Sequence, residues 1–199
     1  KATAGGVEYS NTVTTGAYFG QYEVTLAVFT ATIKVTAASG ATVKAVSGSS
    51  SHSAVANSSG VATITVKKAG TYTVSGTISS GGKTVSSNTA SVNATTSGST
   101  YNATIKFVKL TLTSPSGSAI SITKSGVTLT GTSSGSDVFY LPSTGTWTVT
   151  ITKSGDSATG SVNAAAYQDY TLDLAFVHIY GASWDGSSTT KWTRTDESA

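Results

Sequence analysis

Apolar side chains alternate with polar ones behind an aromatic residue at three places along the chain. The stretch Tyr22-Glu-Val-Thr-Leu-Ala-Val-Phe29 matches Tyr101-Asn-Ala-Thr-Ile-Lys-Phe-Val108, and both match Tyr170-Thr-Leu-Asp-Leu-Ala-Phe-Val177. A repeat of two residues places every second side chain on the same face of a β-strand. Each stretch is therefore predicted to be a strand with one buried face, and its recurrence indicates a tandem repeat.

Two further blocks recur in the same order between these strands. Ala69-Gly-Thr-Tyr-Thr-Val74 corresponds to Thr144-Gly-Thr-Trp-Thr-Val149, and Ser39-Gly-Ala-Thr-Val43 corresponds to Ser116-Gly-Ser-Ala-Ile120. Blocks that keep their order while their spacing drifts indicate two divergent copies with different loop lengths. We expect complete modules over residues 30–106 and 107–176, the last strands of a preceding module over 1–29, and a linker into a different downstream domain over 177–199.

Within the first copy, short stretches rich in Thr, Val and Ile are separated by turns rich in Gly and Ser. We expect strands at Thr30–Ala37, Thr42–Val46, Val61–Lys67, Gly70–Ile78, Lys83–Val92 and Tyr101–Val108. Hairpins are predicted at Gly82-Lys83 and Gly155-Asp156, because glycine adopts the positive φ that tight turns need. Short strands at this spacing are typical of a sandwich. The sequence therefore predicts an all-β fold of tandem immunoglobulin-like β-sandwich domains.

Composition supports the strand prediction and removes several classes of function. Only 11% of the residues are charged, and the residues that favour helices are scarce. The lysines are scattered along the chain, whereas a nucleic-acid binder gathers its positive charge on one face. The absence of cysteine excludes disulfides and thiolate metal sites, and no apolar run of about eighteen residues could span a membrane. We expect neither nucleic acid nor membrane as a partner.

The repeated blocks carry a resemblance to known modules. The segments Ser39–Val43, Ser59–Val66 and Ala69–Val74 resemble the carboxypeptidase-regulatory-like and PEGA-type sandwich modules of bacteria. In that family a glycine ahead of an aromatic residue makes the turn into a core strand, and the resemblance assigns this role to Gly70 and Gly145. Such modules serve as stalks, spacers and binding domains alike, so the resemblance implies a fold more than a function.

The C-terminal stretch Phe176–Ala199 carries a second resemblance. It is similar to the junction found in tail-fibre proteins of phages that infect gut Firmicutes. In those proteins β-modules precede a larger, lectin-like region that contacts the host. The resemblance implies a structural virion protein whose receptor-binding residues lie beyond this chain.

Catalytic and metal-binding candidates are few. Gly131-Thr-Ser-Ser-Gly135 has the letters of a nucleophile elbow, but we expect a loop there instead of the strand-to-helix turn that the motif requires. The two histidines, His52 and His178, lie far apart in the sequence. The carboxylates Asp169, Asp173, Asp185, Asp196 and Glu197 do not form a calcium-loop pattern. We therefore predict no catalytic residue, no metal site and no cofactor.

The aromatic residues divide into two groups. Tyr72, Phe139 and Trp147 lie within alternating strands and are predicted to be core residues. A second group falls at the predicted module junctions: Tyr18, Phe19, Tyr167, Trp184 and Trp192. We expect this group to pack modules or subunits together, and a platform for stacking sugars is the alternative interpretation.

Three functions are compatible with these features. The first is an Ig-like stalk or connector of a phage tail fibre, which would be located on the virion surface and would support host adhesion. The second is a bacterial surface adhesin or an extracellular filament subunit. The third is a carbohydrate-binding accessory module of a secreted enzyme. We expect a homo-oligomer that contacts other appendage subunits, with a bacterial surface glycan as a possible ligand.

Overall fold

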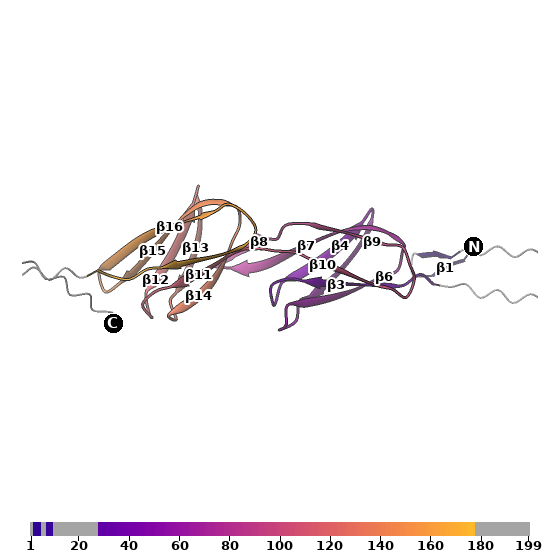
Figure 1. The fold of residues 1–199 in the computed structure, drawn as a ribbon, viewed down its shortest axis with the longest axis horizontal. Coiled ribbons are helices and arrows are strands. Elements are labelled where there is room, and N and C mark those ends of the chain that lie inside the picture. The colour runs from indigo at the N-terminus through magenta and orange to yellow at the C-terminus, as the bar shows by residue number, and fades with distance from the viewer. Residues whose placement is uncertain (1, 5–6, 10–27, 178–199) are drawn as a thin grey trace, which may run out of the picture. The chain divides into compact units, whose positions relative to one another are not determined.

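The computed structural model describes residues 2–4, 7–9 and 28–177, and these form an all-β fold without a helix (Figure 1). No helix that could cross a membrane is therefore present in the described part of the chain. The chain divides into two compact units. Unit 1 comprises the residues up to Ile78 together with Ser86–Lys106. Unit 2 comprises Ser79–Val85 and the residues from Phe107 onward.

Unit 1 contains a sandwich of two sheets, which begins at β3 and whose last residues of β7 and most of β8 are assigned to unit 2. The first sheet has the strand order β10-β3-β6, and the second has the order β5-β4-β7-β8, with β9 also paired to β7. The bounds are β3 Ala31–Thr36, β4 Thr42–Ser47, β5 Ser50–Val55, β6 Val61–Val66, β7 Gly70–Ser80, β8 Lys83–Ser86, β9 Ala90–Ala94 and β10 Thr100–Thr104. All pairings between these strands that are described are antiparallel except that of β10 with β3.

Unit 2 repeats this topology. One sheet has the order β14-β11-β17 and the other the order β13-β12-β15-β16, so β11 and β17 occupy the places that β3 and β10 hold in unit 1. The bounds are β11 Val108–Thr113, β12 Ala119–Lys124, β13 Val127–Thr132, β14 Ser136–Leu141, β15 Gly145–Lys153, β16 Asp156–Ala164 and β17 Asp169–Asp173. The two units are therefore tandem immunoglobulin-like β-sandwiches, with Greek-key-type sheets packed face to face.

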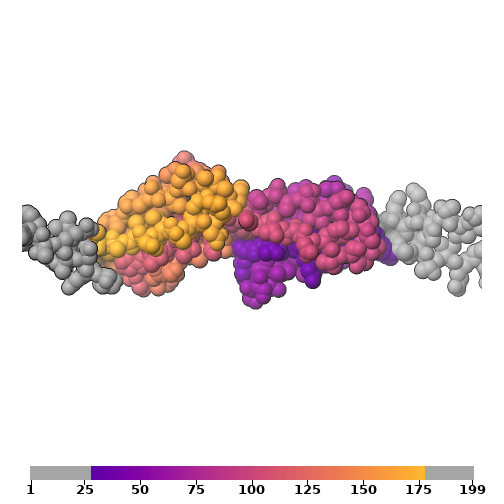
Figure 2. Space-filling model, in the orientation of Figure 1, coloured from indigo at the N-terminus to yellow at the C-terminus, as the bar shows by residue number. Residues whose placement is uncertain are grey.

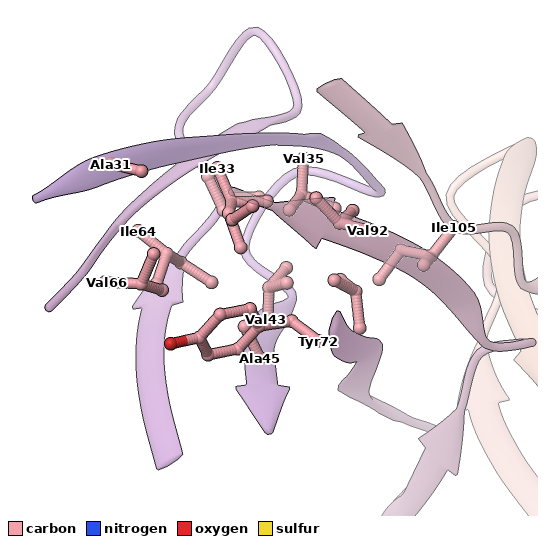
Figure 3. Packing of buried hydrophobic residues seen from close by; sticks show 14 residues of the cluster. Ala31, Ile33, Val35, Val43, Ala45, Ile64, Val66, Tyr72, Val92 and Ile105 are labelled. Atoms are coloured by element: carbon pink, nitrogen blue, oxygen red, sulfur yellow. The ribbon is translucent and has the colours of Figure 1, made fainter. Parts of the chain in front are cut away.

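Each unit closes its own hydrophobic core. In unit 1, Tyr72 lies beneath Ile33, Ile64 and Val66 and is fully buried (Figure 3). In unit 2, Trp147 takes the same place in the strand order and is also fully buried. The alternating pattern predicted both aromatics to be core residues, and the structure confirms this, as it does for Phe139.

The hairpin turns follow the expected chemistry. Gly81 and Gly82 join β7 to β8, and both have positive φ, at 51° and 76°. Ser154 and Gly155 join β15 to β16 in the same way, at 52° and 94°. Two consecutive residues with positive φ are the mark of the type I′ turn, whose twist matches that of the flanking strands. Both predicted hairpins are confirmed, but each turn lies one residue earlier than predicted, because Lys83 and Asp156 already belong to β8 and β16.

Three strand assignments differ from the sequence-based expectation. No strand was predicted where β5 lies, and the single strand expected over Lys83–Val92 is split into β8 and β9. The split occurs at Ser87, whose hydroxyl accepts a hydrogen bond from the N–H of Gly76 at 2.8 Å while its own N–H donates to the carbonyl of Gly76 at 2.9 Å. The strand expected over Tyr101–Val108 ends at Thr104, and β11 begins at Val108.

The outer face of the β13-β12-β15-β16 sheet carries hydroxyl groups. The register aligns them in two rows across the four strands, Thr130-Ser121-Thr150-Thr159 and Thr128-Thr123-Thr148-Ser161. The hydroxyls of Thr150 and Thr159 lie 3.2 Å apart across the strand pair. Alternation places Ile120, Ile122 and Leu129 on the opposite, buried face. Neither row contains a charged side chain.

The first two strands of the chain form a separate small sheet. The strands β1 (Ala2–Ala4) and β2 (Val7–Tyr9) pair antiparallel, with Ala2 opposite Tyr9. Residues 10–27 and 178–199 lie outside the described part of the structure. The interpretation of 1–29 as the end of a preceding module, and of 177–199 as a linker, therefore stays a prediction.

Candidate functional site: the paired first and last strands

In unit 1, the first strand and the last strand lie side by side and run in the same direction. The strands β3 and β10 form five register pairs, from Thr32 opposite Thr100 to Thr36 opposite Thr104. The N–H of Thr32 donates to the carbonyl of Ser99 at 2.9 Å where the pairing begins. The N–H of Ile105 donates to the carbonyl of Thr36 at 3.0 Å where it ends. Backbone hydrogen bonds therefore join the two strands at both ends of the paired segment.

Unit 2 has the same arrangement. The strands β11 and β17 are parallel, with five register pairs from Lys109 opposite Asp169 to Thr113 opposite Asp173. The N–H of Lys109 donates to the carbonyl of Gln168 at 3.1 Å, and the N–H of Leu174 donates to the carbonyl of Thr113 at 2.9 Å. The yellow C-terminal segment is visible on the surface of unit 2 in Figure 2, as its edge position in the sheet requires.

A tyrosine side chain fixes the start of each last strand. The hydroxyl of Tyr101 accepts hydrogen bonds from the N–H groups of Thr95 and Thr96, at 3.0 and 2.8 Å. Donation from the backbone of Thr96, and then from Thr95, lowers the pKa of Tyr101 to about 8, because these bonds stabilise the phenolate. In unit 2 the Tyr170 hydroxyl accepts from the N–H of Ala166 at 2.9 Å. The repeated tyrosine therefore holds the loop that precedes the last strand.

A second aromatic residue closes another loop in each unit. The Tyr72 hydroxyl donates to the carbonyl of Lys68 at 2.8 Å, and burial raises the pKa of this hydroxyl. In unit 2 the side chain of Lys124 also holds the loop before β15. Its ammonium group donates hydrogen bonds to the hydroxyl of Ser143 and the carbonyl of Thr144. The same ammonium group lies 5.7 Å from the centre of the Trp147 ring. These bonds fix the turns that Gly70 and Gly145 begin, at φ 159° and 113°.

The letters of the nucleophile elbow fall on a structural serine. Ser133 is only 4% exposed, and its hydroxyl accepts hydrogen bonds from Ser114 Oγ at 2.9 Å and from the N–H of Gly135 at 3.1 Å. The same hydroxyl donates to the carbonyl of Ser114 at 3.1 Å. Its oxygen and proton are thus already engaged in holding a loop. This loop is shorter than predicted, because Gly131 and Thr132 belong to β13.

The other candidates for chemistry are dispersed. His52 lies on β5, with its ring centre 6.4 Å from that of Tyr72. Asp169 and Asp173 stand at opposite ends of β17, and Asp169 binds Lys109 at 3.2 Å. No group of three potential metal ligands occurs among the described residues. His178, Asp185, Asp196 and Glu197 lie outside them.

Of the five junction aromatics, one can be placed. Tyr167 lies in the loop between β16 and β17 and is 37% exposed. The remaining four, Tyr18, Phe19, Trp184 and Trp192, lie outside the described residues. The exposed Val55 and Val138 belong to the edge strands β5 and β14. Single exposed apolar residues of this kind do not make a patch. The roles assigned to the junction aromatics stay predictions.

The pairing of the terminal strands is what sequence analysis missed. Parallel pairing joins residues that lie far apart in the sequence, and no local pattern around β3 or β10 encodes the partner. The only local signal was the tyrosine motif itself. Its recurrence marked the last strand of each unit, but it did not reveal which strand that last strand joins.

Neither a protein-family model nor a curated protein matches the chain. Among solved structures, it aligns with the Bacillus anthracis TIE protein at 14% identity and a TM-score of 0.29, over 75% of this chain and 34% of that chain. A minor pilin of Streptococcus agalactiae aligns at 12% identity and a TM-score of 0.29, over 74% and 95% of the two chains. A family 26 carbohydrate-binding module from Eubacterium rectale, in complex with maltoheptaose, aligns at 12% and 0.28, over 74% and 92%. The chain thus spans about a third of the TIE protein chain.

Proposed function

We propose that the chain is a spacer in an extracellular appendage, namely a bacterial surface adhesin or filament. Its sandwich units would hold a binding region at a distance and transmit tension to it. One observation carries this proposal: in each unit the first strand and the last strand are parallel neighbours.

Parallel pairing decides where the chain enters and leaves a unit. Because β3 and β10 run in the same direction, the chain enters unit 1 at one end of this strand pair and leaves it at the other. An antiparallel pair would return the chain to the end at which it entered. A unit with separated entry and exit can be repeated along a chain, whereas a unit with adjacent entry and exit forms a side branch.

The connection between the units suits this role. Only the segment Ile105–Phe107 separates β10 from β11, and each unit has a core of its own. The hydroxyl-lined outer face of unit 2 is also compatible with prolonged contact with water.

The location of the protein tests the proposal. Gold-labelled antibodies against the chain should decorate fibres on the bacterial surface. The same topology would serve the stalk of a phage tail fibre, and label confined to the tails of phage particles would favour that carrier. Label confined to the cell interior would overturn the spacer function for both carriers.

Appendage length gives a second test. Deleting residues 107–176 from the full-length protein should shorten the labelled fibre, and duplicating them should lengthen it, as measured by electron microscopy. Fibres of unchanged length in both variants would contradict the proposal.

Carbohydrate binding is the competing function, and it can be tested at the exposed side chain of Tyr167. A spacer should show no heat of binding when the purified chain is titrated with soluble bacterial polysaccharides. Saturable binding that is lost in Tyr167→Ala, but kept in Tyr167→Phe, would favour a carbohydrate-binding module, since the phenyl ring alone supports stacking.

A further inference from the structure

We propose that the parallel pairs β3–β10 and β11–β17 are mechanical clamps, which bear tension on the chain and set the force at which each unit opens. This inference deepens the spacer function, on which its biological meaning rests. The clamp itself is a physical property of each unit and can be measured on the purified chain.

The direction of the load follows from the topology. Tension pulls the start of β3 toward the preceding residues and the end of β10 toward the following ones. These two points lie at opposite ends of the same strand pair, so the force slides the strands past each other. Hydrogen bonds between strands lie across the sliding direction and share the load, so they must break nearly together. Had the force separated the strands from one end, the bonds would have broken one after another.

The register resists stepwise slippage. A slip of one residue would turn Ile33 and Val35 from the core to the solvent face, because alternate residues lie on opposite faces. A slip of two residues would keep the faces but would pull Tyr101 away from the backbone N–H groups that its hydroxyl binds. Both movements therefore have to break burial or side-chain hydrogen bonds in addition to the ladder.

Unit 2 repeats these restraints with different residues. Leu110 and Leu112 are fully buried on β11, and Tyr170 and Leu172 from β17 pack against the same core. The Lys109–Asp169 ion pair also joins the two strands, but both side chains reach the solvent, so water screens the pair and it adds little to the clamp. The same parallel pairing in both copies indicates that the clamp is a general feature of this repeat unit.

The pulling direction provides the decisive test. The chain contains no cysteine, so introduced cysteines are unique handles for single-molecule force measurements. The pair Val28→Cys with Thr104→Cys pulls β3 and β10 in shear. The pair Val28→Cys with Thr100→Cys shares the first handle and pulls the strands apart from one end. All three positions are exposed.

The two handle pairs should give clearly different rupture forces. We expect the shear pair to require at least about twice the force of the peeling pair, because five register pairs are loaded together instead of in sequence. The released lengths should be nearly equal, which shows that the same unit opens in both experiments. Equal rupture forces in the two directions would overturn the clamp.

A pair of proline variants locates the load within the ladder. The N–H of Ile105 faces β3, and the two-residue repeat of a strand places the N–H of Ala103 on the same side and that of Asn102 on the solvent side. When the whole chain is pulled by its ends, Ala103→Pro should lower the force of one unfolding event and leave the other unchanged. Asn102→Pro should leave both events unchanged.

Each outcome for these variants counts for or against the clamp. Equal losses of force in Ala103→Pro and Asn102→Pro would contradict a load borne by this ladder. If Ala103→Pro prevents unit 1 from folding, the comparison of pulling directions, which leaves the ladder intact, decides alone. A clamp without surface labelling would refute the spacer function and leave the mechanical inference standing.

Discussion

The indole Nε1 of Trp147 donates a hydrogen bond to the carbonyl oxygen of Ser143 at 2.9 Å, four residues earlier in the chain. In unit 1 the hydroxyl of Tyr72 makes the same connection to the carbonyl of Lys68. Two different side chains thus keep one hydrogen bond at equivalent positions of the two copies. The chemistry that is preserved is a polar donor at the end of a large, buried ring.

The hydrogen bond of the Tyr72 hydroxyl should contribute measurably to the stability of unit 1. Tyr72→Phe keeps the ring and removes the donor, so the free energy of unfolding should fall by about 1 kcal/mol. Tyr72→Ala should cost about 3–5 kcal/mol, because it also leaves a cavity beneath Ile33. Urea denaturation followed by circular dichroism measures both. Equal stability of Tyr72→Phe and the wild type would contradict a role for the bond.

The lowered pKa of Tyr101 predicts a dependence of stability on pH. Its folded pKa of about 8 lies below the ordinary value of 10.0, so the folded state binds the proton more weakly than the unfolded state does. The contribution is complete above about pH 10 and is lost as the pH falls through about 8. The stability of the wild type relative to Tyr101→Phe should therefore rise between these two values.

Two measurements check this behaviour. Phenolate absorbance should show one tyrosine titrating near pH 8, and this step should be missing in Tyr101→Phe. Urea denaturation of the two proteins across the same pH range should show the widening difference. Parallel stability curves for the wild type and the variant would rule out the effect.

Gly60 predicts a strong response to an added methyl group. Its φ is +74°, and a Cβ there would lie 2.6 Å from the carbonyl oxygen of Ala37, which is too close for any side chain. Gly40, in the same unit, has almost the same φ of +77° but open space around it. Gly40→Ala should cost about 1 kcal/mol through backbone strain alone, and Gly60→Ala at least about 2 kcal/mol. Similar losses in thermal stability for the two variants would refute the predicted clash.

Ser133 predicts a structural phenotype without a catalytic one. Ser133→Ala leaves the part-buried N–H of Gly135 and the buried hydroxyl of Ser114 without their partner, which should cost about 1–3 kcal/mol. Ser116→Ala, at an exposed turn position nearby, should change stability by less than about 0.5 kcal/mol. Ester hydrolysis by the wild type that disappears in Ser133→Ala, with its fold intact, would contradict the structural assignment.

The sequence predicted the parts of the fold that are encoded locally. Alternation identified Tyr72 and Trp147 as core residues, because a large aromatic within a period of two has only one buried face to occupy. The glycine turns were recognisable because positive φ excludes most other residues. Repetition of the blocks revealed two copies, since each copy conserves its own turns and core positions.

The strands that were missed or wrongly bounded also have physical explanations. The strand β5 consists of Ser50-Ser-His-Ser-Ala-Val55, which has little apolar alternation, and it forms because β4 provides a full antiparallel ladder for it. The end of β10 was hidden because Tyr101, Ala103, Ile105 and Phe107 continue one alternation. Ile105 completes the core of unit 1, whereas Phe107 packs edge-on against Tyr140 of unit 2, with ring centres 5.4 Å apart. The pairing of β3 with β10 is nonlocal, and local patterns carry no information about it.

The hydroxyl rows on the outer face of unit 2 have a consequence for the surroundings in which the protein can work. Threonine and serine gain and lose no protons across the ordinary pH range, and dissolved ions have no charge there to screen. A sheet face of this kind should present the same surface in fresh water, in brine and in an acidifying medium. Such constancy would be an advantage for the extracellular spacer proposed above.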